Sequence, residues 1–203
     1  MTDWAALLDR EIHAATTKVS PGTVSCLSNY LTLLSKWGSS INLVASSTTP
    51  LELVTLHVVD CLALVPHVGD ARRLVDVGSG GGLPGAILAI ALPALSVTAL
   101  EPVHKKHAFL ATVRRELRLD NFSPLPERDD QHRTRADFRP YDIAVSRAAF
   151  PLTTWLPRGA ELVRAGGRVL AMEGREHIDL PSGAKRHPYQ LANRDRAIIE
   201  WRR

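Results

Sequence analysis

The stretch of sequence that is most informative about chemistry is a glycine-rich segment that begins with an acidic residue. Residues 75–85 spell VDVGSGGGLPG, after a short apolar run and before a series of small apolar residues. Glycine lets the backbone approach a ligand closely and adopt positive φ angles. Open parallel sheets bind nucleotides at loops between a strand and the following helix. The segment therefore predicts a site for a nucleotide-like cofactor.

Two classes of cofactor compete for this loop. From Gly80 the chain reads G-x-G-x-x-G, the fingerprint of dinucleotide binding. A carboxylate at Asp76 would repel a pyrophosphate, whereas it suits a cationic cofactor that carries an amino-acid moiety. Glu101, at the end of the next expected strand, can accept hydrogen bonds from a ribose diol of either class and disfavours NADP. Asp76 therefore favours S-adenosylmethionine over NAD, while a tight turn without a ligand would leave five glycines in eight residues unexplained.

The pattern around this loop predicts a Rossmann-like α/β fold. Strands alternate with helices, which indicates βαβ units and a mostly parallel sheet. The expected strands are 74–77, 96–101, 141–146 and 168–172, and the expected helices are 86–92, 104–119 and 151–162. A late strand at 197–201 could be antiparallel, and 127–140 is expected to form a loop.

The first 65 residues are expected to be helical. Apolar side chains spaced three and four residues apart predict a helix from Pro21 to Trp37, with Ser20 as its N-cap. The spacing of Thr49 and Glu52 predicts a capping box at the start of another helix. We therefore expect an N-terminal helical extension over 1–65 that packs on a methyltransferase domain over 66–203, in one unit.

Composition is that of a folded protein in a reducing compartment. The chain has 203 residues, with 45% hydrophobic and 23% charged, and its two cysteines are expected to be free thiols. We expect no apolar run close to the roughly 20 residues that span a bilayer. The acidic N-terminus is unlike a signal peptide. These features favour a cytoplasmic protein without a membrane partner.

Charge is distributed unevenly along the chain. Residues 1–70 carry three Lys and Arg against six Asp and Glu, whereas residues 71–203 carry 22 against 15. A basic catalytic half would favour a polyanionic substrate, because neutralising phosphates releases counterions. A solvated basic surface explains the same charge equally well, so the charge leaves both interpretations open.

Several segments together resemble one family, the RsmG (GidB) small-subunit ribosomal RNA guanine-N7 methyltransferases. The resemblance covers most of the chain and includes the LPG ending of the glycine loop and the SRA segment that ends at Ala148. The segments that carry it are Lys36-Trp37, Ile41-Asn42-Leu43, His57–Cys61, Asp76–Gly85, Lys105-Lys106, Phe109-Leu110 and Asp142–Ala148.

The resemblance implies a class I S-adenosylmethionine-dependent enzyme that methylates N7 of a guanine in 16S rRNA. It implies 16S rRNA or the small ribosomal subunit as partner. We also expect a monomer and no metal, because the histidines show no convincing zinc spacing with Cys26 or Cys61. Catalysis would need no general base, and the catalytic residues stay unassigned, with Arg147 a candidate for positioning. The residues expected to bind the cofactor are Asp76, Gly78, Gly80, Gly82, Leu83, Glu101, Asp129, Asp130 and Arg147. The candidates for binding RNA are Lys105, Lys106, Arg114, Arg115, Arg133 and Arg135.

Some of these residues have simpler structural explanations. Arg147 could pair with a helix end, and His57 and Asp60, one helical turn apart, are expected to make a mutual or capping contact rather than to catalyse.

The sequence departs from the family pattern in three places. Glu101 replaces the usual aspartate, Ala111 replaces an arginine, and Glu173 replaces a lysine in the AMEG segment that ends at Gly174. Four arginines in 127–140 suggest that basic charge has moved there, so replacing all four should weaken the salt dependence of RNA binding. A methyltransferase for another substrate and a non-catalytic RNA-binding relative remain alternatives, with an NAD-dependent dehydrogenase further away.

Overall fold

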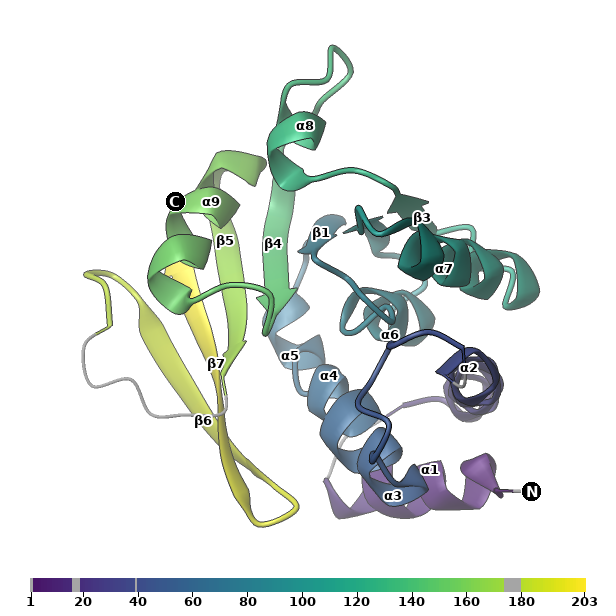
Figure 1. Cartoon of the computed structure of the whole chain (residues 1–203). Helices are drawn as coiled ribbons and strands as arrows, with labels where there is room; N and C mark the ends of the chain where they lie inside the picture. The colour runs from purple at the N-terminus through teal and green to yellow at the C-terminus, as the bar shows by residue number, and fades with distance from the viewer. Residues whose placement is uncertain (1, 16–18, 39, 174–179) are drawn as a thin grey trace.

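A computed structural model describes residues 2–15, 19–38, 40–173 and 180–203. In this part of the chain, seven strands form one sheet in the order β3-β2-β1-β4-β5-β7-β6 (Figure 1). The strands are β1 (Arg73–Val77), β2 (Ser96–Leu100), β3 (Phe122–Leu125), β4 (Tyr141–Arg147), β5 (Val163–Glu173), β6 (Lys185–Leu191) and β7 (Arg194–Arg202). The helices are α1 (Trp4–Ala14), α2 (Pro21–Gly38), α3 (Pro50–Glu52), η1 (Leu53–Val59), α4 (Asp60–Leu62), α5 (Val65–Val68), α6 (Gly85–Ala91), α7 (His104–Glu116), α8 (Asp129–Arg133) and α9 (Leu152–Leu162).

The sheet confirms the predicted α/β class. Strands β1 to β5 are parallel, and β7 pairs antiparallel with β5 and β6, as the late strand at 197–201 suggested. The strand order reverses between β1 and β4, and such switch points open a crevice at the carboxyl ends of the strands. The glycine loop follows β1, and Arg147 ends β4, so both border this crevice.

The elements β3, α8 and β6 escaped prediction, each for a physical reason. β3 has only four residues and contains Pro124. The expected loop at 127–140 contains α8, a helix of five residues that is too short to show periodicity. β6 and β7 are joined by a two-residue turn at Ala192 and Asn193, both with positive φ, where Asn-Gly would have been the recognisable signal.

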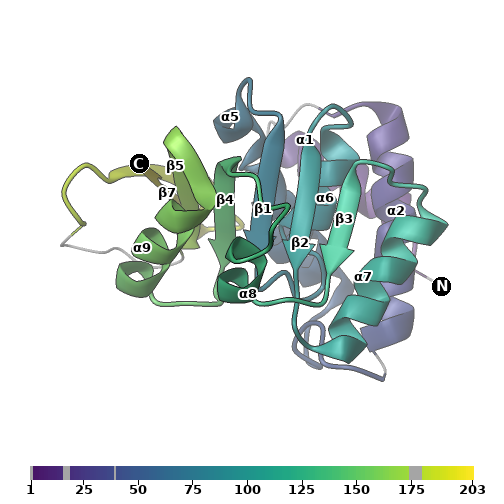
Figure 2. The same cartoon turned by 90° about the horizontal axis from the view of Figure 1, so that it is seen from above.

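Side-chain alternation along the strands produces two cores, one on each face of the sheet. The first face carries Leu74, Val97, Phe122, Ile143 and Leu170, which pack against α6, α7 and the N-terminal helices. The second carries Val75, Leu100, Ala144, Val169 and Ile199, which pack against α9. Figure 2 shows α9 and the N-terminal helices on opposite sides of the sheet.

The N-terminal helices begin where their caps predict. The Thr23 amide donates to Ser20 Oγ at 3.2 Å, and Thr49 and Glu52 form the expected capping box. The Pro50–Val68 run corrects one expectation, because this helical run of 19 residues is long and apolar enough to cross a membrane, and its most apolar stretch has a mean hydropathy of 1.6. In this fold 56% of its most apolar stretch is buried, against the same core as α1 and α6.

A glycine in α9 provides a test of how closely the second face is packed. A Cβ on Gly159 would lie 2.5 Å from Val169 Cγ1, whereas a Cβ on Gly38, in α2, would meet no described heavy atom within 4 Å. Gly159→Ala should lower the free energy of unfolding by about 1–3 kcal/mol, the usual effect of overpacking. Gly38→Ala, the control, should raise it by up to about 1 kcal/mol. Urea unfolding measures both, and equal effects would contradict the packing described.

Candidate cofactor and substrate cavity

The glycine loop is folded over the buried carboxylate of Asp76. Its Oδ2 accepts hydrogen bonds from Ser79 Oγ at 2.6 Å and from the Gly85 amide at 2.9 Å. Its Oδ1 is buried and has no hydrogen-bond partner among the described residues. Burial raises the Asp76 pKa to about 6, although both hydrogen bonds oppose the shift. The carboxylate therefore fixes the loop while one oxygen keeps its acceptor capacity.

The loop needs glycine at the three positions expected to bind the cofactor. Gly78, Gly80 and Gly82 have φ angles of 73°, 57° and 84°, a region that side chains disfavour. A Cβ on Gly82 would lie 2.7 Å from that of Ala86, and one on Gly78 would lie 2.8 Å from that of Ala149. The loop therefore presents bare backbone to the crevice.

Two further side chains hold the loop from outside it. Glu101 follows β2 and is 4% exposed, and its carboxylate accepts from the amides of Gly80 at 2.8 Å and Val103 at 2.9 Å. Each carboxylate oxygen can accept a second hydrogen bond, so Glu101 remains able to bind a ribose diol. Tyr30 of α2 donates its hydroxyl to the Gly81 carbonyl at 2.6 Å, a contact between residues 51 positions apart that spacing could not reveal.

A cavity of about 820 Å³ opens between the ends of β1 and β4. Gly78, Gly80, Leu83 and Arg147 line it, so four of the predicted cofactor residues meet there. The cavity is completed by Leu43, from a segment that carries the family resemblance, and by residues that the sequence did not point to, including Phe150, Arg194 and Arg196. It has the size of a small-molecule site, and it extends well beyond the loop.

Arg147 is anchored on the N-terminal helices while it lines this cavity. Its Nη1 donates to the Leu56 carbonyl at 3.1 Å and lies 3.4 Å from Asp60 Oδ2, and its Nη2 donates to His57 Nδ1 at 2.8 Å. Arg147 therefore makes the contact with a helical segment that was its simpler structural explanation, and it also lines the cavity. His57 and Asp60 share Arg147 as a side-chain partner, and the Asp60 amide also donates to the His57 carbonyl at the end of η1, a capping contact of the kind that their spacing suggested.

Asp60 is also bonded to side chains of the C-terminal hairpin. It is fully buried and accepts from Arg196 Nη2 at 2.6 Å, Arg196 Nε at 3.0 Å and the Tyr189 hydroxyl at 2.7 Å. These bonds fix Arg196 at the cavity edge. Glu173, the residue that departs from the family pattern, lines the same cavity, and Gly174 lies outside the described residues.

Asp129 and Asp130 lie apart from the residues that line the main cavity. They line a smaller cavity with Arg133, Arg158 and Glu161. Asp129 is buried and forms a two-bond ion pair with Arg158, with N–O distances of 2.6 and 2.9 Å. Their role at the adenine end of the cofactor stays a prediction.

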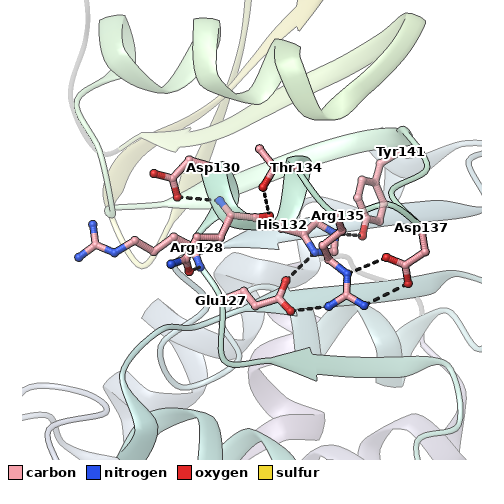
Figure 3. Close-up of polar contacts among 9 residues, drawn as sticks. Glu127, Arg128, Asp130, His132, Thr134, Arg135, Asp137 and Tyr141 are labelled. Carbon is pink, nitrogen blue, oxygen red and sulfur yellow. Dashed lines mark hydrogen bonds and ion pairs between the residues drawn. The ribbon is translucent and has the colours of Figure 1, made fainter.

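The arginines between 127 and 140 are balanced by carboxylates. Figure 3 shows Arg135 between Glu127 and Asp137, with N–O distances of 2.6 and 2.8 Å, and Arg133 pairs with Glu161. The segment contains four acidic residues beside its four arginines. The suggestion that basic charge has moved to this segment is therefore weaker than the arginine count implied.

The other candidates for binding RNA lie on α7. Lys105, Arg114 and Arg115 are exposed, and Lys106 is half-buried. Ala111, where the family has arginine, lines a surface hollow together with three arginines of this region, Arg114, Arg115 and Arg118. The basic charge lost at Ala111 is thus present on its neighbours.

One group of possible metal ligands, away from the main cavity, is found among the described residues. Side-chain ligand atoms of His67, His187 and Glu200 lie within 4.8 Å of one another. Glu200 is also paired with Arg202 at 3.3 Å. The expectation that the protein uses no metal stays a prediction.

Solved structures with this architecture define its class. A putative O-methyltransferase from Klebsiella pneumoniae aligns with a TM-score of 0.63 at 15% identity, covering 98% of this chain and 97% of that one. The O-methyltransferase TomG from Streptomyces achromogenes, solved in complex with S-adenosylmethionine, aligns with a TM-score of 0.62 at 15% identity, covering 98% of each chain. This protein therefore has the Rossmann-like fold of class I S-adenosylmethionine-dependent methyltransferases.

Sequence comparison identifies the family within that class. The profile of the GidB family, described as rRNA small subunit methyltransferase G, matches residues 23–193. Proteins named ribosomal RNA small subunit methyltransferase G are 40% identical in Burkholderia pseudomallei, over 89% of this chain and 81% of theirs, and 41% identical in Aromatoleum aromaticum, over 88% and 87%. The chain belongs to the rRNA small subunit methyltransferase G family.

The residues around the loop fit S-adenosylmethionine, the cofactor that the sequence favours. Bare backbone at Gly78 and Gly80 lines the cavity, Glu101 keeps acceptor capacity for a ribose, and Asp76 Oδ1 is an unpartnered acceptor beneath the loop within the described structure.

Asp76→Asn should change how stability depends on pH. Because the Asp76 pKa is raised from 3.8 to about 6, the folded state retains a proton that the unfolded chain has lost in this window. The contribution of Asp76 to the free energy of unfolding is therefore largest below pH 3.8 and falls as the pH rises to about 6. The total fall is up to about 3 kcal/mol, because each unit of pKa difference corresponds to about 1.36 kcal/mol. In urea unfolding, the wild type should lose stability relative to Asp76→Asn as pH rises. A difference that is independent of pH would show that Asp76 is not titrating there.

Proposed function

We propose that this protein transfers a methyl group from S-adenosylmethionine to N7 of a guanine in 16S rRNA of the small ribosomal subunit. The observation that carries the proposal is a single cavity that joins the glycine loop to Arg147, Arg194 and Arg196. The loop binds the cofactor, and Asp60 holds Arg147 and Arg196 in place on the cavity wall. Arg194, which forms no ion pair among the described residues, suits the phosphate of a nucleotide. The names of the relatives support ribosomal RNA as the substrate class.

We further propose a monomeric, cytoplasmic enzyme that acts in ribosomal RNA processing without a membrane partner. The two cysteines are free, with Cys26 half-buried and Cys61 buried, which suits a reducing compartment. The burial of more than half of the most apolar stretch of the Pro50–Val68 run supports a role in the protein core.

The chemistry requires positioning more than proton transfer. Bound S-adenosylmethionine supplies an activated methyl group on a positively charged sulfur. Guanine N7 has an exposed lone pair and carries no proton, so no general base is needed. The side chains of the cavity wall therefore hold the base in line for attack and exclude water, which can lower a barrier substantially. Ala148, directly after Arg147, has a φ of 56°, so the chain turns sharply at the point where this wall begins.

The exposed surface formed by α7 and the residues just after it is the better candidate for the RNA backbone. Among the described residues, Arg114 and Arg118 form no ion pair, and both are exposed. Arg133 and Arg135 are already paired with carboxylates. An arginine without an ion pair gains a new partner when it binds a phosphate, whereas a paired arginine must first give up its carboxylate. The two pairs of arginines should therefore differ in how much they contribute to RNA binding.

Salt dependence separates these two surfaces. Removing a phosphate contact lowers the slope of log K against log salt by about 0.7–0.9. Arg114→Ala with Arg118→Ala should therefore reduce the slope for RNA by about 1–2. The matched control, Arg133→Ala with Arg135→Ala, should change it much less. Filter binding at several salt concentrations measures both slopes, and a larger effect from the control pair would place the RNA on the 127–140 segment instead.

Methyl transfer to purified small subunits tests the function directly. Subunits that lack the modification are incubated with the protein and radiolabelled S-adenosylmethionine, and the RNA is then digested to nucleosides. Label in 7-methylguanosine at one site is the expected result. Cofactor binding without transfer would indicate another substrate or a non-catalytic relative, an outcome that the carboxylate of Glu173 in the cavity would help to explain.

A further inference from the structure

The imidazole of His57 is held in one chemical form on the cavity wall. Its Nδ1 lies 2.8 Å from Arg147 Nη2. A guanidinium has donors and no acceptor, so Nδ1 must be the unprotonated acceptor of this bond. In the neutral ring the proton then resides on Nε2. Arg147 therefore fixes His57 as the tautomer whose free nitrogen is a donor.

The donor nitrogen of His57 is available to a ligand. Within the described chain, Nδ1 is the ring nitrogen that forms a hydrogen bond, and the residue lines the main cavity. Arg147 itself is held on its other side by Asp60 and the Leu56 carbonyl, which prevents it from following a ligand. The ring is thus held through Nδ1, with the second ring nitrogen left for a ligand of the cavity that His57 and Arg147 both line.

The charges around His57 keep it neutral. Arg147 on β4 and Arg196 on β7 disfavour its protonation, while Asp60 on α4 and Glu52 on α3 favour it. Burial is the largest influence, and with Arg147 it lowers the His57 pKa to about 4. A neutral donor suits a reaction that places positive charge on a purine, because an imidazolium would repel the product.

Guanine differs from adenine next to the atom that is methylated. Guanine presents N7 and O6, both acceptors, on this edge, whereas adenine presents N7 and an amino donor. A fixed N–H donor beside N7 therefore attracts guanine and repels adenine. We propose that His57 Nε2 donates to O6 of the target guanine and thereby selects this base, with Arg147 as the positioning residue. This inference rests on the proposed function, since it assigns the recognition of its substrate base.

Two variants of His57 separate recognition from structure. An asparagine places a carbonyl oxygen near the position of Nδ1 and can still accept from Arg147, whereas a glutamine places an amide N–H near the position of Nε2. His57→Asn should lower kcat/KM for subunits about tenfold, equivalent to one hydrogen bond of roughly 1.4 kcal/mol. His57→Gln should recover part of this loss. The affinity of both variants for S-adenosylmethionine, measured by calorimetry, should stay within about twofold of the wild type, since the hydrogen bond to O6 is made by the base.

Substrate analogues complete the test on the RNA side. Subunits are reconstituted with inosine or 2-aminopurine at the mapped target position. Inosine keeps O6 and lacks the 2-amino group, whereas 2-aminopurine keeps the amino group and lacks O6. The wild type should prefer inosine, and His57→Asn should lose about tenfold of that preference, because the two changes remove the same hydrogen bond.

The outcomes are distinguishable from a failure of the proposed function. If the wild type methylates guanine and the effects of His57→Asn and 2-aminopurine multiply independently, the role of His57 in recognition is overturned while the function stands. If the wild type labels no guanine, both fail together. If His57→Asn does not fold, coupling is measured with His57→Ala, which also lacks an N–H at the position of Nε2 and should lose the preference for inosine to a similar extent; an unchanged preference would contradict the proposal.

Discussion

A buried carboxylate joins three distant parts of the chain at the edge of the cavity. Asp60 lies in the N-terminal helices and receives Arg147 from the end of β4 and Arg196 and Tyr189 from the C-terminal hairpin. Removing one partner of a buried ion pair commonly costs about 3–5 kcal/mol, because the remaining charge is left without compensation. Asp60 therefore ties the positions of these segments to one another, and with them the side chains that line the cavity.

A second buried carboxylate organises the opposite side of the cavity. Asp76 holds the glycine loop through Ser79 and the Gly85 amide, and Tyr30 fixes the loop from α2. The two carboxylates have different partners, since Asp76 is bonded within its own loop and Asp60 is paired with arginines from other elements. The cofactor side thus rests mainly on bonds within its own loop, with Tyr30 and Glu101 as outside supports, whereas the substrate side is built by tertiary contacts. This division agrees with a fold in which the loop is shared by a class and the opposite wall is particular to a family.

Sequence patterns predicted the local part well. The alternation of strands and helices, the two helix caps and the glycine loop each depend on residues close together in the chain, so spacing alone was sufficient. The partners of Arg147 could not be predicted, because Leu56 and His57 lie about ninety positions away. For the same reason Arg194, Arg196 and Tyr30 were missed. The arginines of 127–140 show the opposite error, since a count of basic residues does not reveal the carboxylates that neutralise them.

The central claim is that Asp60 couples the three segments that form the substrate side of the cavity. Amide hydrogen exchange of the wild type and Asp60→Asn tests it most directly, because exchange reports local opening along the whole chain. The account predicts faster exchange in residues 53–62, 147–152 and 185–196 together, with exchange in β2 and α7 unchanged. Faster exchange confined to the residues next to Asp60, or spread evenly over the whole sheet, would contradict it.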